Sequence, residues 1–409
     1  MKIEINPGLG AMAKESAMQP KEQLLEVKTQ TSGLFIGVPK ETAMQENRLP
    51  ITPDGVALLV NNGHAVTIEA GAGQGSKFDD RAYSEAGAHI AYSPNEVYEQ
   101  SDLVLKINPP SMDEIGLMKP GCSLISALQV TQLTTDYFQA LNAKKITGIA
   151  FEMIEDPVGS VPIVRAMSEI AGSTVLLIAA EYLNSNNAGR GIIMGGVTGV
   201  PPTKVVIIGA GTVGEYACRC AIGLGAEVKI FDNHLYKLRR IKQELGANIF
   251  TSTIDLANLS DAIKRADVVI GALRAEEGRT PCVVSEDMVA CMKPDSIVLD
   301  VSIDQGGCFE TSEMTSHSQP TFKKFGVTHY CVPNIASRVA HTATSALSNI
   351  LTPIILRANE LGGIEDMIFA KEWFMKGVYC YKGSLTNKHL ARMLNMRYKD
   401  LNLFKMARF

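Results

Sequence analysis

The sequence lacks the marks of several large protein classes. None of its eight cysteines forms a CxxC pair, which argues against a structural zinc site and favours reduced thiols in a cytoplasmic protein. The net charge is −4, so no basic excess is available for nucleic acid or for an anionic membrane surface. Charges or glycines interrupt every long apolar run, so we expect no membrane insertion. The first residues also lack the apolar core of a secretory signal.

The length and the order of the patterns predict two α/β domains. A chain of 409 residues is too long for one ordinary core. Residues 1–33 show no clear pattern, and we interpret them as an extension. From Leu34 onward, apolar strand patterns alternate with helical patterns, which is typical of a parallel sheet.

Two long apolar segments divide this alternation. Residues 167–185 are helical in composition and too apolar for a surface helix, so we expect them to be buried between two domains. Residues 341–361 predict another long apolar helix. Between them, residues 189–202 are rich in glycine and proline and predict a hairpin or loop. A second α/β series follows and runs to about residue 335. The final segment, 371–409, is expected to be helical.

The strongest local signal is a nucleotide-binding pattern that starts with the apolar stretch 205–208. Gly209, Gly211 and Gly214 form GxGxxG where this strand turns into a helix, so that backbone N–H groups can face a pyrophosphate. Asp232 ends the next strand and can accept both ribose hydroxyls while repelling a 2′-phosphate, which favours NAD over NADP. Lys237 either reaches the adenosine ribose or is a solvated helix charge.

Motifs along the whole chain carry a family resemblance. From about residue 35 to the C-terminus, the sequence resembles the alanine dehydrogenase family, which also includes the nucleotide-binding alpha part of proton-translocating transhydrogenase. The resemblance rests on these stretches, in order: GVPKE, ENRLPITPDGV, EAGAGQGSKFDD, LVLKINPP, MSEIAG, VVIIGAGTVG, DVSIDQGGCFETS and CVPNIASRVAHTATSALSN.

The resemblance implies both an architecture and a reaction. It implies two Rossmann-like domains with parallel sheets, in which an NAD-binding domain (166–339) is inserted into a discontinuous substrate domain (34–165 and 340–409). The implied reaction is the reversible oxidative deamination of L-alanine to pyruvate and ammonium. A small amino or oxo acid would be the substrate, no metal would be needed, and the chain would form a hexamer or dimer of identical subunits.

Two cations are the implied substrate ligands. Lys106 matches the lysine of an LLKVK-like strand end that binds the substrate's carbonyl or carboxylate, where an ammonium stabilises developing charge. Arg48 matches the arginine that holds the substrate carboxylate in its planar fork. The alternative for both residues is a pair of surface cations.

Three further residues match family positions near the nicotinamide. Asp304, in the DQGG motif, matches an acid beside the ring and the substrate amine, and its alternative is a turn or cap residue. Ser168 matches a serine near the cofactor, and its alternative is the N-cap of the long helix. Asn334 matches an asparagine at the edge of the nicotinamide.

The sequence departs from the family at a catalytic position. Alanine dehydrogenases carry a histidine in an FLHLA-like stretch as general acid and base, and the aligned residue here is Gln129. An amide cannot carry a proton near neutral pH, so another group must do so. Asp304 or Lys106 could serve, and His341 is a geometric possibility.

A second departure leaves other functions open. The stretch NIASRVAH contains Arg338, which resembles the transhydrogenase branch, although that branch usually loses the DQGG aspartate that is present here. One alternative function is therefore the soluble NAD(H)-binding alpha subunit of a transhydrogenase. Another is an NAD-binding regulatory or structural protein that has lost catalysis together with the histidine.

Overall fold

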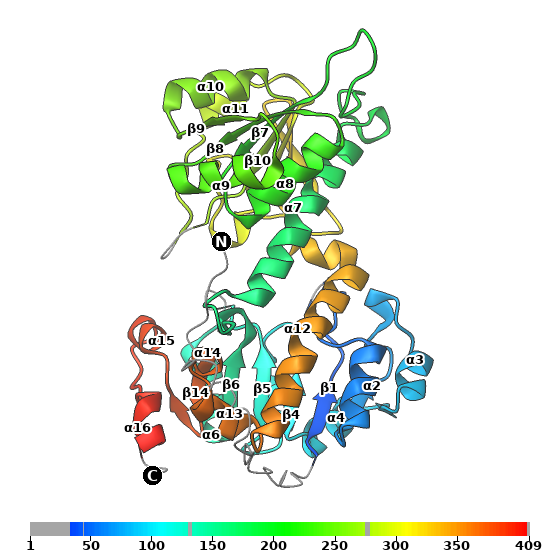
Figure 1. The fold of residues 1–409 in the computed structure, drawn as a ribbon, viewed down its shortest axis with the longest axis vertical. Coiled ribbons are helices and arrows are strands. Elements are labelled where there is room, and N and C mark those ends of the chain that lie inside the picture. The colour runs from blue at the N-terminus through cyan, green and yellow to red at the C-terminus, as the bar shows by residue number, and fades with distance from the viewer. Residues whose placement is uncertain (1–32, 44, 130–132, 275–278, 407–409) are drawn as a thin grey trace, which may run out of the picture. The chain divides into compact units, whose positions relative to one another are not determined.

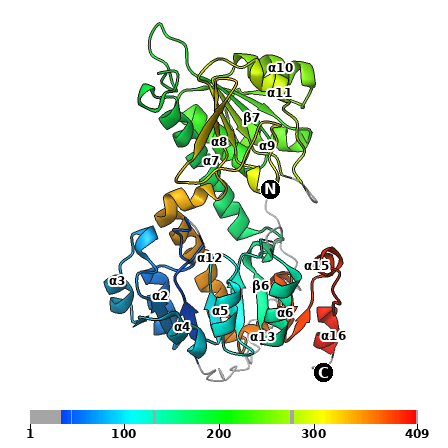
Figure 2. The same cartoon turned by 180° about the vertical axis from the view of Figure 1, so that it is seen from behind.

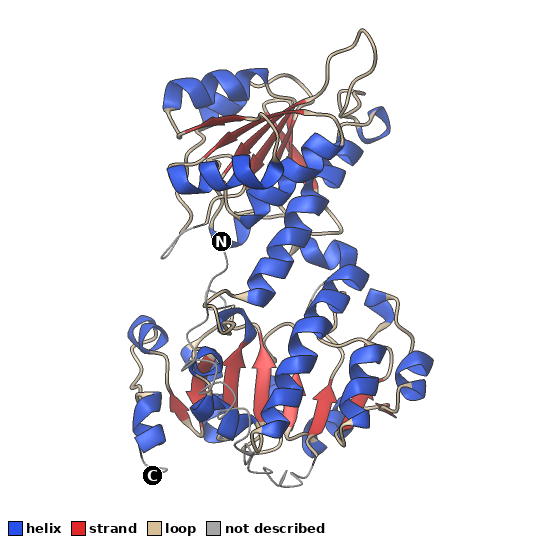
Figure 3. Cartoon of the chain, viewed as in Figure 1, coloured by secondary structure: helices blue, strands red, loops and turns tan. Residues whose placement is uncertain are grey.

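A computed structural model describes residues 33–43, 45–129, 133–274 and 279–406, and residues 33–409 form one compact unit. Apart from Gly33, the predicted N-terminal extension lies outside the described residues. Two mostly parallel sheets organise the unit and confirm the predicted α/β class (Figures 1 and 3). The predicted boundaries at 165/166 and 339/340 stay a prediction.

The first sheet takes strands from both ends of the chain. Its order is β15-β14-β6-β5-β4-β1-β2-β3. The strands are β1 (Phe35–Val38), β2 (Ala65–Glu69), β3 (His89–Ala91), β4 (Leu103–Leu105), β5 (Ser123–Ser126), β6 (Thr147–Ala150), β14 (Val378–Tyr381) and β15 (Ser384–Leu385). Strands β1 to β6 pair in parallel, whereas β14 pairs antiparallel with β6 and with β15.

The prediction of an all-helical final segment was wrong, because it contains β14 and β15. The residues Val378–Tyr381 are all buried, and their β-branched and aromatic side chains fit a sheet better than a helix. Short helices surround this hairpin: α13 (Ile364–Ala370), α14 (Glu372–Met375), α15 (Lys388–Met393) and α16 (Leu401–Met406).

Helices cover both faces of the first sheet. The helices are α2 (Pro53–Asn61), η1 (Gln74–Ser76), α3 (Asp80–Glu85), α4 (Pro94–Gln100), α5 (Met112–Leu117), α6 (Thr135–Ala143), η3 (Phe151–Met153) and α12 (Ala340–Glu360). Strand β4 shows the layering: Leu103 and Leu105 join the core under α2 and α12, while Val104 joins the core under α4, α5 and α6. Figure 2 shows α5 and α6 on the face opposite to α12.

The second sheet has the order β12-β13-β11-β10-β7-β8-β9. Its strands are β7 (Lys204–Ile208), β8 (Glu227–Phe231), β9 (Phe250–Ser252), β10 (Val268–Gly271), β11 (Ile297–Asp300), β12 (Thr321–Lys324) and β13 (Val327–Tyr330). The helices are α7 (Pro162–Tyr182), η4 (Ser185–Asn187), α8 (Thr212–Gly223), α9 (Leu235–Leu245), α10 (Leu256–Arg265), α11 (Glu286–Ala290), η5 (Ile303–Gln305) and η6 (Ile335–Val339). Only β12 is antiparallel to its neighbour among the pairs described.

The two long apolar segments form α7 and α12. By length and composition alone, Pro162–Tyr182 and Ile335–Glu360 could cross a membrane, so the expectation that charges or glycines interrupt every long apolar run was too strict. Both helices contribute to cores, however. Val175 and Ile178 of α7 pack in the core of the second sheet, and Leu347 and Leu351 of α12 pack in the core of the first.

A glycine-to-alanine pair tests whether β14 completes the first sheet. A Cβ on Gly148 of β6 would lie 2.4 Å from the ring of Tyr379, which is fully buried on β14. We expect Gly148→Ala to lower the free energy of unfolding by about 1–3 kcal/mol in urea melts, because the core cannot accept the methyl group. Gly116→Ala in α5 is the control, since nothing lies within 4 Å of its Cβ position. Equal stability of the two variants would contradict the pairing.

Candidate active site

Polar side chains gather at the carboxyl edge of the first sheet. Strands β1, β4, β5 and β6 are neighbours that run in parallel, so the residues after their last positions meet at one edge. Glu41 follows β1, Lys106 follows β4, Gln129 follows β5 and Glu152 follows β6. Ligands of open α/β sheets bind at this edge, which makes it the candidate active site.

Lys106 is buried in a network of carboxylates. Its side chain is 1% exposed, and its Nζ lies 3.0 Å from Glu114 Oε1 and 3.5 Å from Glu41 Oε2. Tyr98 donates a hydrogen bond to the same Glu114 oxygen. Glu41 also accepts hydrogen bonds from the backbone N–H groups of Ile107 and, more weakly, the next residue. The ammonium is therefore not a surface cation, and in this structure it neutralises buried acids.

The carboxylate of Glu46 joins residues from three parts of the chain. It accepts a bidentate pair of hydrogen bonds from Arg48, at 2.8 Å from Nε and 2.7 Å from Nη2. Oε2 also accepts from Asn108 Nδ2 at 3.1 Å and from Asn334 Nδ2 at 2.8 Å. These donors, Arg48 first, hold the pKa of Glu46 below its usual value although burial opposes the shift.

The remaining donors of Arg48 lie beside the start of α7. The Arg48 side chain is 11% exposed, so it is not a surface cation either. Its Nη1 contacts Met167 Sδ at 3.6 Å, and sulfur is only a weak acceptor. The guanidinium thus keeps strong hydrogen-bonding capacity for a further anion.

Gln129 belongs to the same group of hydrogen-bonded side chains, the Glu46 cluster, which consists of Glu46, Arg48, Asn108, Asn334 and Gln129. Its Nε2 donates to Asn108 Oδ1 at 2.6 Å, so Asn108 links Gln129 to Glu46. The backbone of Gln129 is left-handed (φ 43°), and the carboxylate of Glu152 accepts a hydrogen bond from the preceding N–H of Leu128 at 2.7 Å.

Sequence reasoning missed Glu46, Asn108 and Glu152. Asn108 could have been found from the sequence, because this residue occupies the second lysine position of the LLKVK-like pattern, two residues beyond Lys106. The structure brings this asparagine, rather than Lys106, into contact with Gln129 and with the partner of Arg48.

The glycine loop after β7 fits a dinucleotide. Gly209 has φ +113°, and a Cβ there would lie 2.3 Å from Ala272 O. A Cβ on Gly214 would lie 1.9 Å from Gly209 O, so this residue allows the close approach of helix and strand. A Cβ on Gly211 would meet nothing within 4 Å, which leaves open space where α8 begins without a side-chain cap.

Asp232 lies directly after β8 and is buried. Its Oδ2 accepts a hydrogen bond from Ala210 N at 2.7 Å, which ties the acid to the glycine loop. Its Oδ1 accepts from the backbone N–H of His234 at 2.7 Å, and the His234 ring nitrogen Nδ1 lies 3.0 Å away. Lys237 lies half-buried in the first turn of α9, where its Nζ is 5.9 Å from the centre of the Tyr236 ring.

The DQGG segment forms a tight turn after β11. Asp304 lies in η5 and is exposed, while the surrounding protein raises the pKa of its carboxyl against the effect of nearby N–H groups. Gly306 and Gly307 both have left-handed backbones (φ +99° and +72°). The buried carboxylate of Asp300 holds this turn by accepting hydrogen bonds from Ser302 N and Cys308 N, both at 3.0 Å.

The positions of Ser168 and His341 decide two alternatives that the sequence left open. Ser168 lies inside α7, which starts at Pro162, so the expectation that it could be the N-cap was wrong. His341 stacks on Phe78 with ring centres 4.5 Å apart, and its Nδ1 lies 2.8 Å from Ser76 O. The histidine therefore contacts η1 and not the Glu46 cluster.

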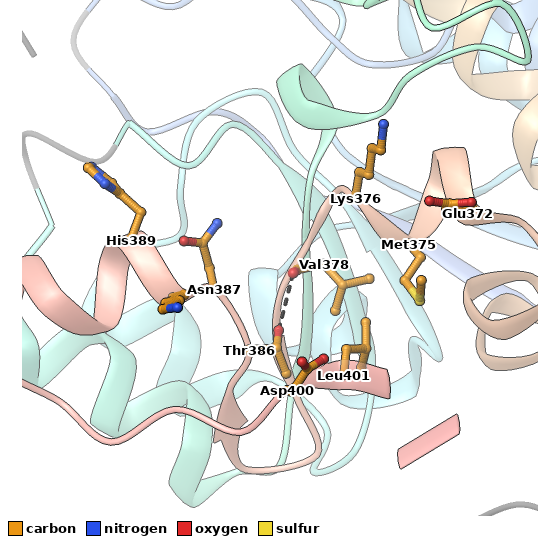
Figure 4. Close-up of a pocket in the computed structure, with 10 residues that line it drawn as sticks. Glu372, Met375, Lys376, Val378, Thr386, Asn387, His389, Asp400 and Leu401 are labelled. Carbon is orange, nitrogen blue, oxygen red and sulfur yellow. Dashed lines mark hydrogen bonds between the residues drawn. The ribbon is translucent and has the colours of Figure 1, made fainter. Parts of the chain in front are cut away.

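A separate surface pocket lies near the C-terminal hairpin (Figure 4). Lys376, Asn387, His389 and Asp400 are among its lining residues, and Thr386 Oγ1 donates to Val378 O at 3.1 Å. It shares no residue with the Glu46 cluster. Within the described residues, no group of three or more His, Cys, Asp or Glu side chains could hold a metal ion.

Comparisons with known proteins identify the family. Sequence models described as "Alanine dehydrogenase/PNT" match residues 37–171 (N-terminal domain) and 175–388 (C-terminal domain). An alanine dehydrogenase of Mycolicibacterium smegmatis is 38% identical over 91% of this chain and all of its own length. One from Methanococcus maripaludis is 40% identical over 89% of this chain and 98% of its own.

Solved structures agree with the sequence comparison. An L-alanine dehydrogenase structure has a TM-score of 0.84 and 35% identity, covering 88% of this chain and 99% of its own. A transhydrogenase from Sinorhizobium meliloti, at 23% identity and a TM-score of 0.74 over 87% of this chain and 99% of its own, shares the fold. The chain belongs to the alanine dehydrogenase/PNT family.

Proposed function

We propose that the chain catalyses the NAD-dependent, reversible oxidative deamination of L-alanine to pyruvate and ammonium. The observation that carries the proposal is the Arg48 guanidinium, which is oriented by Glu46 at the carboxyl edge of the first sheet. Relatives named alanine dehydrogenase, which match nearly the whole chain, supply the reaction class. The protein would act in the cytoplasm as a homo-oligomer.

Arg48 would bind the carboxylate of the amino or oxo acid. Glu46 occupies the Nε and Nη2 donors on one side of the guanidinium, which fixes its plane. The Nη1 group, next to Met167, remains to donate to the substrate in a charge-assisted hydrogen bond. Because Asn108 and Asn334 hold Glu46 in turn, the arginine is set in place before the substrate arrives.

The dinucleotide would lie on the glycine loop, with Asp232 as the ribose acceptor and Lys237 nearby. When bound, NAD would accept the hydride that leaves the substrate Cα. Ser168 and Asn334 would contact its nicotinamide end, as the family resemblance implies. Asp304 would orient the amino group, since its exposed carboxyl can accept hydrogen bonds from an ammonium or a water.

A second function is favoured by one specific observation. Lys106 is occupied by Glu41 and Glu114, and the neighbouring site positions hold the amides Asn108 and Gln129. A chain of this family with these features could bind NAD(H) and turn over no amino acid. NADH oxidation with ammonium across a panel of 2-oxo acids, with pyruvate included, separates the two functions.

Arg48→Lys tests whether Arg48 binds the substrate carboxylate. Lysine keeps the charge that Glu46 requires but loses the planar fork, so the KM for pyruvate should rise about tenfold or more. The Kd for NADH, measured by fluorescence titration, should be unchanged. Arg165→Lys is the control, because Arg165 forms an exposed pair with Glu169 on α7. A KM that stays constant would remove Arg48 from substrate binding.

Asp232→Asn tests the choice of cofactor. The amide oxygen can still accept the hydrogen bond from Ala210, but the negative charge that repels a 2′-phosphate is gone. The ratio of kcat/KM for NADH over NADPH should therefore fall about tenfold or more. The same ratio measured for Asp255→Asn, an exposed helix cap of α10, serves as the control. An unchanged ratio would mean that another group selects the cofactor.

Lys106→Ala separates a buried counter-charge from a substrate ligand. Loss of the ammonium leaves Glu41 and Glu114 without their cation, so the free energy of unfolding should fall by about 3–5 kcal/mol. Lys119→Ala, which breaks an exposed pair with Asp102, should cost less than about 1 kcal/mol in the same urea melts. A Lys106→Ala protein that is fully stable, binds NADH normally and has lost turnover would show that Lys106 acts on the substrate directly.

A further inference from the structure

The site needs a proton carrier that Gln129 cannot provide. In oxidative deamination, a water must lose a proton as it attacks the imine carbon, and the departing nitrogen must gain one. The side chain of Gln129 donates to Asn108 and has no titration near neutral pH. Asp304 of η5 is one candidate, and the carboxyl edge of the first sheet holds further acids that could take the proton and return it.

Three of the acids at the carboxyl edge of the first sheet are bound by a cationic side chain, by backbone N–H groups or by both. Glu46 is bound by Arg48, and Glu114 is bound by Lys106, so the pKa of each is lowered. Burial raises the pKa of Glu41 as well, but this acid shares Lys106 and accepts two backbone N–H groups, so both of its oxygens have partners. These carboxylates are committed to neighbours whose loss would leave buried charge.

Glu152 differs from these acids. Its Oε1 accepts the N–H of Leu128, while its Oε2 is buried and has no hydrogen-bond partner within the described part of the chain. Burial raises the pKa of its carboxyl, and the backbone N–H groups of Leu128, Gln129 and Glu152 itself oppose this shift. Among the residues that the structure describes, no cation contributes to this balance.

The surroundings of Glu152 favour the protonated form. Tyr379 on β14 senses the charge of Glu152, and Tyr137 on α6 lies next to that tyrosine. Both phenols are buried and have pKa values raised well above the usual range, so they stay neutral. A carboxyl with one unpaired, buried oxygen among neutral groups is stable with a proton.

We propose that Glu152 exchanges the catalytic proton in place of the family histidine that Gln129 replaces. The assignment rests on the proposed deamination. Strands β5 and β6 are neighbours, so the residue after β6 lies beside the loop in which the histidine would stand. Glu152 is bound to that loop through Leu128 N.

The proton balance of the step is simple. The water oxygen bonds to the iminium carbon, and one water proton goes to Glu152 Oε2, giving a neutral carbinolamine. Glu152 then returns this proton to the nitrogen. As the C–N bond breaks and the carbonyl forms, the hydroxyl proton leaves with the nitrogen, so that pyruvate and ammonium are released.

Glu152→Gln tests this assignment while keeping the acceptor for Leu128 N. Deamination needs the ionised carboxyl, so its rate should rise with pH through the pKa of Glu152, and reductive amination should fall over the same range. Both dependences should disappear in the variant, with kcat lowered about 10²–10⁴-fold. Glu155→Gln, which removes the half-buried partner of the exposed Lys376, should keep the wild-type profile. Gln129→His added to Glu152→Gln should restore activity at least about tenfold.

Infrared spectra of protein with ¹³C-labelled glutamate supply a readout that does not depend on turnover. The protonated carboxyl band should be weaker in Glu152→Gln than in the wild type and in Glu155→Gln, and the remainder belongs to other acids such as Glu41, whose pKa is also raised by burial. An active wild type whose pH profile and carboxyl band are unchanged by Glu152→Gln overturns the role of Glu152 alone. A wild type that turns over no 2-oxo acid in the panel overturns the proposed reaction, and with it this role.

Discussion

The hydrogen bonds to the Glu46 carboxylate are the constraint on which the candidate site depends. A single buried acid accepts from Arg48, Asn108 and Asn334, which lie in segments far apart in the sequence. Removing Arg48 would leave the acid partly unsatisfied, because the Glu46 side chain is only 1% exposed. The hydrogen bonds to Glu46 therefore keep the Arg48 guanidinium, the loop after β4 and the start of η6 in one arrangement.

The parts of the fold that the sequence predicted are those set by local patterns. The apolar stretch before Gly209, the glycines themselves and Asp232 follow from the steric needs of one strand-to-helix turn. The strands before Lys106 and Gln129 were likewise readable from continuous apolar runs. The hairpin of β14 and β15 was not, because its pairing with β6 joins positions more than 200 residues apart and is decided by tertiary packing.

The site residues likewise divide into those that sequence motifs predicted and those that only the structure revealed. Arg48, Gln129 and Asn334 were found by matching motifs, and the structure joins them through two residues that no motif singled out, Glu46 and Asn108. Lys106 was found as a cation at a strand end, but sequence alone could not reveal that Glu41 and Glu114 surround it. Whether a charge is available or already neutralised depends on partners that are distant in the chain.

The balance of charge explains why proton exchange and substrate binding must be considered together. Two cations, Lys106 and Arg48, pair with the carboxyls of Glu41, Glu46 and Glu114, while Glu152 is bound by a backbone N–H. If all four were ionised, the edge would carry an excess of negative charge and would repel an anionic amino or oxo acid.

Burial raises the pKa of Glu41 and of Glu152, which favours the neutral form of both carboxyls, while the other two acids are paired with cations. With fewer ionised carboxyls at the edge, Arg48 meets less opposition when it attracts a carboxylate. A proton on Glu152 would remove a repulsive charge before a 2-oxo acid binds and would then be available for reductive amination, whereas deamination begins from the ionised carboxyl.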